Sequence, residues 1–356
     1  MRSPIYALEH QLAARFVDSG GCEVPASFQD PEGEYRAVRT DCGMADLCHR
    51  GKVSVEGPDC KAFLHGFVTA DINGMADDAS GYAAILNIKG KMIADARVHL
   101  SGGRIVLDVE PGLAGAVTTH LDKYTLGFQS EVKDRSEELG HLGLYGPEAP
   151  RVLGRFLGEE LGPLEPGALL ACDFDGQPLW IAGSALTGEH GFDLVLPREL
   201  TPALWTALLE LGTGLRPVGL DALEILRVEA GVPRFGPDMG EDTIPLEANL
   251  DHAISYTKGC YLGQETIARV THRGHVNRKL TGLLLERGGV VRAGTKLMDG
   301  DREAGSLTSV VVSPALGRPV ALGYVRRELL EPGKKLTLES GGEATVHGLP
   351  FYGSSQ

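Results

Sequence analysis

The stretch VSVEGP at residues 53–58 is the first copy of a recurring local pattern from which we predict the fold. Its first half alternates apolar and polar side chains as a strand does, and a Gly-Pro turn then leads to the apolar residues at 62–64. Because the first turn of a helix tolerates proline, the stretch predicts a strand, a turn and a helix. The same pattern recurs in LGLYGP at residues 142–147. The recurrence predicts a duplicated α+β unit, with coincidence as the alternative because such turns are common.

The segments around these two stretches predict further local structure. Residues 97–100 and 104–109 both alternate apolar and polar side chains, and they flank the turn sequence SGG at 101–103. This arrangement is typical of a β-hairpin. Apolar residues at helical spacing predict helices over residues 113–126, 200–211 and 218–229, and Gly231 and Pro233 end the last of them.

The character of the sequence changes after about residue 275. Short β-prone runs separated by Gly and Pro follow at residues 280–285, 305–312, 320–324 and 335–338. Such runs are typical of a small all-β sandwich or barrel. We therefore expect two α+β units within residues 1–272, with the boundary between them left open. A short linker then leads to a β-rich domain over residues 276–356.

Composition argues against a nucleic-acid-binding, membrane-spanning or secreted protein. The 356 residues carry 34 Lys and Arg against 48 Asp and Glu, for a formal net charge of −14. Since binding to a phosphate backbone needs surplus cations, direct nucleic-acid binding is not expected, although a local basic groove is compatible with this charge. No run approaches the roughly 20 apolar residues of a membrane helix, and the N-terminal sequence has no apolar core of a secretory signal.

The six cysteines, at positions 22, 42, 48, 60, 172 and 260, are too few and too scattered for a disulfide scaffold. They also lack the two-residue spacing of a zinc site, so no metal site is expected. Reduced thiols in a cytoplasmic protein are the simplest interpretation.

The stretch KGCYLGQE at residues 258–265 is the strongest candidate for chemistry. Gly263 suits the N-cap of a helix, which places Cys260 just before a helix N-terminus with Lys258 nearby. Both features favour the thiolate over the thiol, so a reactive cysteine is one interpretation. The alternative is a turn in which a small cysteine is buried and Lys258 is solvated.

A second candidate lies in TGEHGFD at residues 187–193. The glycines beside Glu189 allow a ligand to approach closely, and its carboxylate could accept two parallel hydrogen bonds from an amino-pyrimidine edge. The alternative is a hairpin turn with a solvated glutamate. His190 is interpreted as a turn residue.

Two further side chains are candidates for ligand contacts. Arg227, in the third predicted helix, could reach an anionic ligand tail, or it could only pair with Glu224 three residues earlier. Tyr82, before the apolar run 83–86, offers an aromatic face or a phenol donor, with a half-buried core position as the alternative.

These motifs resemble a known family. KGCYLGQE resembles the signature of the YgfZ family, folate-binding proteins that support iron–sulfur cluster maturation. The wider sequence is similar to the superfamily of the glycine-cleavage T-protein, an aminomethyltransferase. The similar segments are residues 35–46, 82–87, 187–191 and 226–231.

The resemblance implies two related ferredoxin-like α+β units and a C-terminal β-barrel, arranged as a ring around a tetrahydrofolate site. It implies that Glu189 holds the pterin, that Tyr82 lines the folate pocket, and that Arg227 lies near the folate's anionic tail. The T-protein has two consecutive aspartates, of which the first is catalytic. Here these positions are Ala94 and Asp95, with Asp95 kept as a pocket residue.

The resemblance leads to two functional hypotheses. The first is a tetrahydrofolate-binding accessory protein that supports assembly or repair of iron–sulfur clusters in client enzymes, with Cys260 and Lys258 as the functional pair. Its partners would be folate and iron–sulfur client or assembly proteins, and any effect on tRNA modification would be indirect. The second is an aminomethyl- or methyltransferase of glycine-cleavage type. Because a methyl group cannot exchange protons, Ala94 argues against this second activity. A folate-binding module without chemistry is a further alternative.

Overall fold

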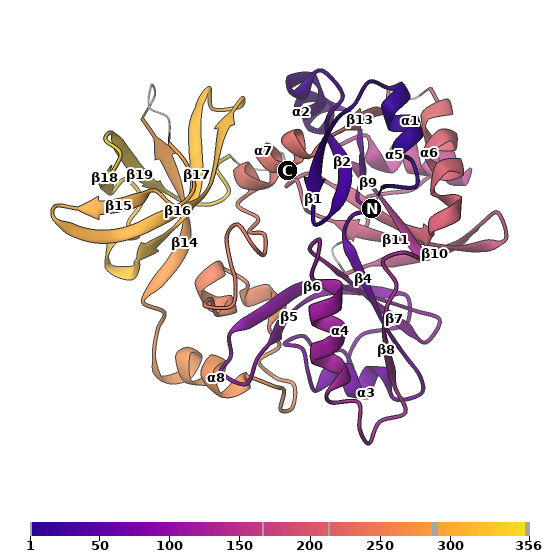
Figure 1. The fold of residues 1–356 in the computed structure, drawn as a ribbon, viewed down its shortest axis with the longest axis horizontal. Coiled ribbons are helices and arrows are strands. Elements are labelled where there is room, and N and C mark those ends of the chain that lie inside the picture. Colours follow the sequence, from indigo (N-terminus) through magenta and orange to yellow (C-terminus); the bar gives the residue numbers. More distant parts are fainter. Residues whose placement is uncertain (1, 166, 213, 287–290, 353–356) are drawn as a thin grey trace. The chain divides into compact units, whose positions relative to one another are not determined.

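The computed structural model describes residues 2–165, 167–212, 214–286 and 291–352 (Figure 1). The chain divides into two compact units, which are treated separately below. The first unit comprises residues 1–85, 93–223 and 253–261. The second comprises residues 86–92, 224–252 and 262–356. No helix in the described part of the chain is both long and apolar enough to cross a membrane.

One sheet of the first unit contains the predicted hairpin. Its strands run in the order β5–β6–β7–β4–β8, and Ser101 pairs with Arg104 at the tight turn between β6 and β7. Helices α3 and α4 supply Phe63 and Val117 to a core that also contains Val53 of β4. The bounds are β4 Gly51–Glu56, α3 Cys60–His65, β5 Ala79–Leu86, β6 Met92–Ser101, β7 Arg104–Val109, α4 Ala114–Asp122 and β8 Glu131–Asp134.

A second sheet of the same unit is built in a similar way. Its strands run in the order β10–β11–β12–β9–β3–β13, and helices α5 and α6 supply Leu153 and Trp205 to its core. Helix α2 leads into β3, and a short helix and hairpin precede α2. The bounds are α1 Tyr6–Gln11, β1 Arg15–Ser19, β2 Cys22–Ser27, α2 Pro31–Thr40, β3 Gly43–Asp46, β9 Leu139–Tyr145, α5 Ala149–Leu157, β10 Leu169–Phe174, β11 Gln177–Ser184, β12 Gly191–Pro197, α6 Thr201–Glu210 and β13 Arg216–Val218.

Both copies of the recurring sequence form a strand, a turn and a helix. Gly57 follows β4 with φ 111°, and Gly146 follows β9 with φ 126°. A Cβ atom would lie 2.3 Å from the carbonyl oxygen of Gln129 at the first glycine, and 2.4 Å from that of Asp41 at the second. Glycine is therefore required at both turns for the same two reasons, backbone conformation and close approach. The duplication itself stays a prediction.

The second unit contains the predicted β-rich region as a closed barrel. Strand β14 pairs with β17 on one side and with β19 on the other, which closes the order β14–β17–β16–β15–β18–β19. The barrel core includes Leu283, Leu307 and Val325. The bounds are α7 Leu220–Ala230, of which residues from 224 belong here, α8 Gln264–Arg273, β14 Arg278–Leu285, β15 Lys296–Asp299, β16 Arg302–Ser313, β17 Arg318–Arg326, β18 Lys335–Leu338 and β19 Glu343–His347.

Candidate functional site

Tyr82 and Asp95 meet on neighbouring strands of the first sheet. The Tyr82 hydroxyl, on β5, donates a 2.6 Å hydrogen bond to Oδ2 of Asp95, on β6. Asp95 is buried, with 7% of its surface exposed. Its other oxygen, Oδ1, is buried without a hydrogen-bond partner among the described residues. Because a buried carboxylate oxygen without a donor is costly, this atom marks a position where a ligand could supply one.

The alternation of β6 separates Asp95 from Ala94. Ala94, Ala96 and Val98 belong to the apolar core under the helices, whereas Asp95 and Arg97 lie on the opposite, polar face. Ala94 is fully buried in that core. A carboxylate at position 94 would therefore be surrounded by aliphatic side chains. The carboxylate on the polar face of β6 is Asp95, and the expected effect of Ala94 on activity stays a prediction.

The surroundings of Asp95 raise its pKa above the ordinary value for an aspartate. Burial raises the pKa of Asp95, and the negative charge of Glu110 raises it further, while the Tyr82 hydrogen bond and Arg50 oppose the shift. Burial and the charge of Asp95 together raise the pKa of Tyr82 well above its ordinary value, so Tyr82 remains a donor. A carboxyl group with a raised pKa beside a fixed donor is suited to exchange a proton with a bound ligand.

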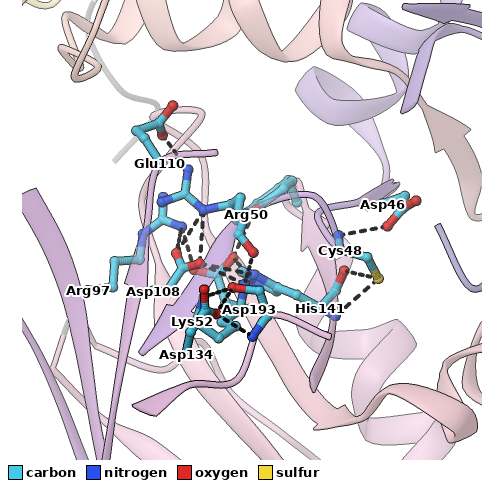
Figure 2. A network of polar contacts seen from close by, with 12 residues as sticks. Asp46, Cys48, Arg50, Lys52, Arg97, Asp108, Glu110, Asp134, His141 and Asp193 are labelled. Carbon is cyan, nitrogen blue, oxygen red and sulfur yellow. Dashed lines mark hydrogen bonds and ion pairs between the residues drawn. The ribbon is translucent and has the colours of Figure 1, made fainter. Parts of the chain in front are cut away.

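A group of buried ion pairs supports this polar face (Figure 2). Asp108 of β7 accepts two hydrogen bonds from Nε of Arg50, at 3.0 and 2.8 Å. It also contacts Nζ of Lys52 at 2.9 Å and Nη1 of Arg97 at 3.2 Å. Arg50 reaches Glu110 as well. Burial disfavours the ionised form of Asp108, but the charges of Arg50 and Lys52 outweigh it and hold the pKa of Asp108 well below its ordinary value.

The second sheet contributes to the same group of ion pairs. Arg97 lies 3.3 Å from Oδ2 of Asp193 on β12, whose Oδ1 accepts a 2.7 Å hydrogen bond from the Tyr145 hydroxyl. His141 of β9 lies between the two aspartates, with Nε2 3.3 Å from Asp193 and Nδ1 3.6 Å from Asp108. The polar faces of both sheets of the first unit are thus joined by charges. This group was not predicted from the sequence, although strands β4, β6 and β7 carry charged side chains at alternate positions.

Glu189 lies in the turn between β11 and β12, as the hairpin interpretation predicts. Its carboxylate has a partner in the protein, because Oε1 accepts a 2.6 Å hydrogen bond from Nη1 of Arg39 on α2. Nε of Arg39 in turn donates to the Tyr35 hydroxyl at 3.2 Å. The side chains of Arg39 and Glu189 are 13% and 17% exposed. Arg39 therefore fixes the direction of a carboxylate that remains reachable from solvent.

Arg227 belongs to the second unit and is almost completely buried. The alternative pairing with Glu224 is confirmed, with Nε of Arg227 donating to Glu224 at 3.0 Å. Its other nitrogens donate to Asp238, Ser309 and the carbonyl of Val232. The guanidinium thus ties α7 to β16 with acceptors from the protein itself. Contact with a folate tail stays a prediction.

Lys258 is half-buried, and its ammonium group is bound by the protein backbone. Its ammonium group donates to the backbone carbonyls of Val68 and Ala70, at 2.9 and 2.7 Å, and also to that of His65. Burial lowers the pKa of Lys258 to about 8, with the charge of Asp71 acting in the opposite direction. Lys258 thereby holds segment 65–70 in place. Its predicted action on a thiolate stays a prediction.

Cys260 is the one exposed cysteine of the six, all of which are free thiols in the described structure. Helix α8 begins at Gln264 with Gly263 as its N-cap, as the sequence predicts. The described residues contain no group of three or more His, Cys, Asp or Glu side chains arranged to hold a metal ion. The candidate site of the first unit therefore consists of Tyr82 and Asp95, with Glu189 on a separate turn.

Known proteins resemble the chain over almost its whole length. Residues 5–258 match the GCVT N-terminal domain family, and residues 278–353 match the glycine cleavage T-protein C-terminal barrel domain family. An aminomethyltransferase of Rubrobacter xylanophilus is 34% identical, over 99% of this chain and 94% of its own length. One from Thermosynechococcus vestitus is 33% identical, over 99% and 95%. The crystal structure of the glycine cleavage system aminomethyltransferase T from Bartonella henselae aligns with a TM-score of 0.91 and 28% identity, over 99% of this chain and 98% of that one.

Proposed function

Because the chain belongs to the glycine cleavage T-protein family, we propose that it binds tetrahydrofolate and transfers an aminomethyl-type one-carbon group to it. The observation that carries the proposal is the buried Oδ1 of Asp95, which has no hydrogen-bond partner among the described residues. A folate ring nitrogen has the N–H group that such an oxygen needs. The residues present in the first unit therefore fit this ligand.

Glu189 and Tyr82 would hold the ligand next to Asp95. Glu189, fixed by Arg39, offers the carboxylate edge that a pterin's amino-pyrimidine group requires. Tyr82 presents an aromatic ring beside Asp95, to which its hydroxyl is hydrogen-bonded. Bound tetrahydrofolate would supply the nitrogen nucleophile that receives the one-carbon unit.

Asp95 would act on the proton of that nitrogen. In its ionised form it accepts a proton or stabilises positive charge that develops there, and burial strengthens the electrostatic effect. Tyr82 keeps one carboxylate oxygen engaged, which leaves Oδ1 free to face the ligand. Ala94 takes no part, because it packs into the apolar core.

Glu189→Ala is expected to weaken tetrahydrofolate binding by roughly tenfold to a hundredfold, because hydrogen bonds to a charged group contribute about 1.5–3 kcal/mol. Anaerobic calorimetric titration of wild type and variant measures the change. Glu138→Ala is the matched control, since Glu138 also pairs with an arginine, at 2.7 Å, but is 59% exposed. Equal affinities of wild type and Glu189→Ala, or no binding to wild type, would contradict the proposal.

A second candidate function, support of iron–sulfur enzymes, is favoured by the exposure of Cys260 within KGCYLGQE. On this proposal the thiol acts toward client or assembly proteins while folate is bound. In cells depleted of the protein, Cys260→Ala should then fail to restore iron–sulfur enzyme activity. Cys172→Ala, at a half-buried thiol, should restore it. Full restoration by Cys260→Ala would exclude a role for the thiol and leave aminomethyl transfer as the better account.

A further inference from the structure

A cavity of about 680 Å³ lies at one end of the barrel in the second unit. Its size falls within the range of small-molecule sites, which is roughly 300–1,000 Å³. Basic and amide side chains dominate the lining, with a single acidic residue. The lining residues are His275, Asn277, Arg302, Arg326, Arg327 and Glu328.

The strand register brings these residues together. Arg278, at the start of β14, pairs with Arg326, at the end of β17. Strand β16 begins at Arg302 and pairs antiparallel with β17, so its first residues also lie at this end of the barrel. The amide of Arg327 donates a 3.0 Å hydrogen bond to the carbonyl of Asn277, which fixes the segment before β14 against the turn after β17. The cavity is thus formed by ordered backbone.

The charges in this cavity are not balanced by the protein. Within the described part of the chain, the guanidinium groups of Arg326 and Arg327 form no ion pair. Arg302 meets Glu328 only at 3.9 Å, with side chains 71% and 57% exposed, which makes a weak pair. Three arginines against one glutamate leave a surplus of positive charge in a chain whose net charge is −14. An anionic ligand would balance it.

We propose that this cavity binds the phosphate group of a small phosphorylated molecule. A guanidinium group offers parallel N–H donors that match phosphate oxygens, and a phosphate with a charge near −2 can engage more than one arginine. A single carboxylate carries one charge and is satisfied by one guanidinium. His275 and Asn277 add further side-chain nitrogens to the lining. None of the residues that line this cavity is among the side chains proposed to hold folate, so the two bindings can be tested with separate variants.

Calorimetric titration of the full-length protein with pyrophosphate tests this proposal. Wild type is expected to bind, and the double variant Arg326→Gln with Arg327→Gln should weaken binding by roughly tenfold or more, as expected for lost charge-assisted hydrogen bonds. Arg302→Gln should also weaken pyrophosphate binding. Arg292→Gln, at an exposed arginine of the same unit that does not line the cavity, should bind as wild type does.

Three results would overturn the proposal. They are no heat of binding with wild type at millimolar pyrophosphate, unchanged binding in the double variant, and equally tight binding of the polycarboxylate citrate. The thermal midpoint of each variant is measured beside the titration, and it should stay unchanged because Arg302 and Arg327 are exposed and Arg326 is half-buried. Failure of tetrahydrofolate binding would not alter any of these outcomes, so the two proposals fail separately.

Discussion

Asp95→Asn is expected to lower the rate of one-carbon transfer to tetrahydrofolate by about 10²–10⁴-fold, the usual contribution of a general acid or base. The substitution keeps the size of the side chain and can still accept from Tyr82, but it removes the ionisable group. The measurement is turnover with an aminomethylated lipoyl carrier and tetrahydrofolate. Binding of tetrahydrofolate should change far less than turnover, because the proposed role concerns the proton.

The pH profile distinguishes this role from a structural one. Since Asp95 acts in its ionised form and burial and Glu110 raise its pKa, the wild-type rate should rise with pH through that raised value. Glu110→Gln removes the neighbouring negative charge, which lowers the pKa of Asp95 and moves the rising limb to lower pH. In Asp95→Asn the limb should disappear. A profile for Glu110→Gln that coincides with that of wild type would contradict the assignment.

Ala94→Asp tests whether position 94, and not position 95, is the catalytic position. If position 94 were the catalytic one, this change would raise the rate. The structure instead buries position 94 among aliphatic side chains, so the variant should gain no activity and lose several kcal/mol of unfolding free energy, about the cost of burying an unpaired polar or charged group. A faster variant of unchanged stability would show that Ala94, and not Asp95, occupies the position that matters.

Asp108→Asn is expected to have the largest effect on stability, a loss of about 3–5 kcal/mol in the free energy of unfolding. The carboxylate of Asp108 is fully buried and contacts Arg50, Lys52 and Arg97. Asparagine leaves these cations without their shared counter-charge and turns an amide donor toward other donors. Urea unfolding measures the loss. Glu32→Gln, which removes an exposed pair with Arg36, should cost less than about 0.5 kcal/mol.

The same substitution should change the response to acid. The folded-state pKa of Asp108 lies well below the unfolded value of about 3.9, so its contribution to stability is complete above that value. It is lost as pH falls below about 4 toward the folded-state pKa. Asp108→Asn lacks this titration, and its stability should therefore fall less steeply below pH 4 than that of wild type. Parallel acid curves, or a stability loss below 1 kcal/mol, would contradict the account of the buried ion pairs.

Local patterns in the sequence predicted part of the secondary structure, and they did not predict strands such as β1, β2, β3, β8 and β10. The hairpin at 97–109, both strand–turn–helix segments and the barrel after residue 278 follow from side-chain alternation and from Gly and Pro positions. Helix α4 is shorter than its predicted range, because its apolar pattern continues beyond the last helical residue, Asp122. Neighbouring residues alone decide such features, so they can be read without knowledge of distant contacts.

The candidate site was only partly predictable. Tyr82 and Glu189 were candidates from local patterns, Asp95 was added by family resemblance, and the structure shows that Tyr82 and Asp95 meet. Arg39, the partner of Glu189, lies 150 residues away in sequence and could not be found from local spacing. The sequence allowed Arg227 either to contact an anionic ligand or to pair with Glu224. The three-residue spacing to Glu224 is the same in both cases, so it could not distinguish them.

The amino-acid sequence by itself determined the T-protein superfamily, the local strand, turn and helix segments named above, and the alternation of strand β6. The resemblance to the YgfZ family within that superfamily stays a prediction. Only the tertiary structure decided what covers each side of that strand. A period of two assigns Ala94 and Asp95 to opposite faces, but it does not say which face meets helices and which meets another sheet. Here the charged face is covered by Asp193 and His141 from strands more than 30 residues further along the chain. The pKa of Asp95 depends on burial and on the charge of Glu110, which directly follows strand β7, and for that reason its chemistry depends on the folded chain.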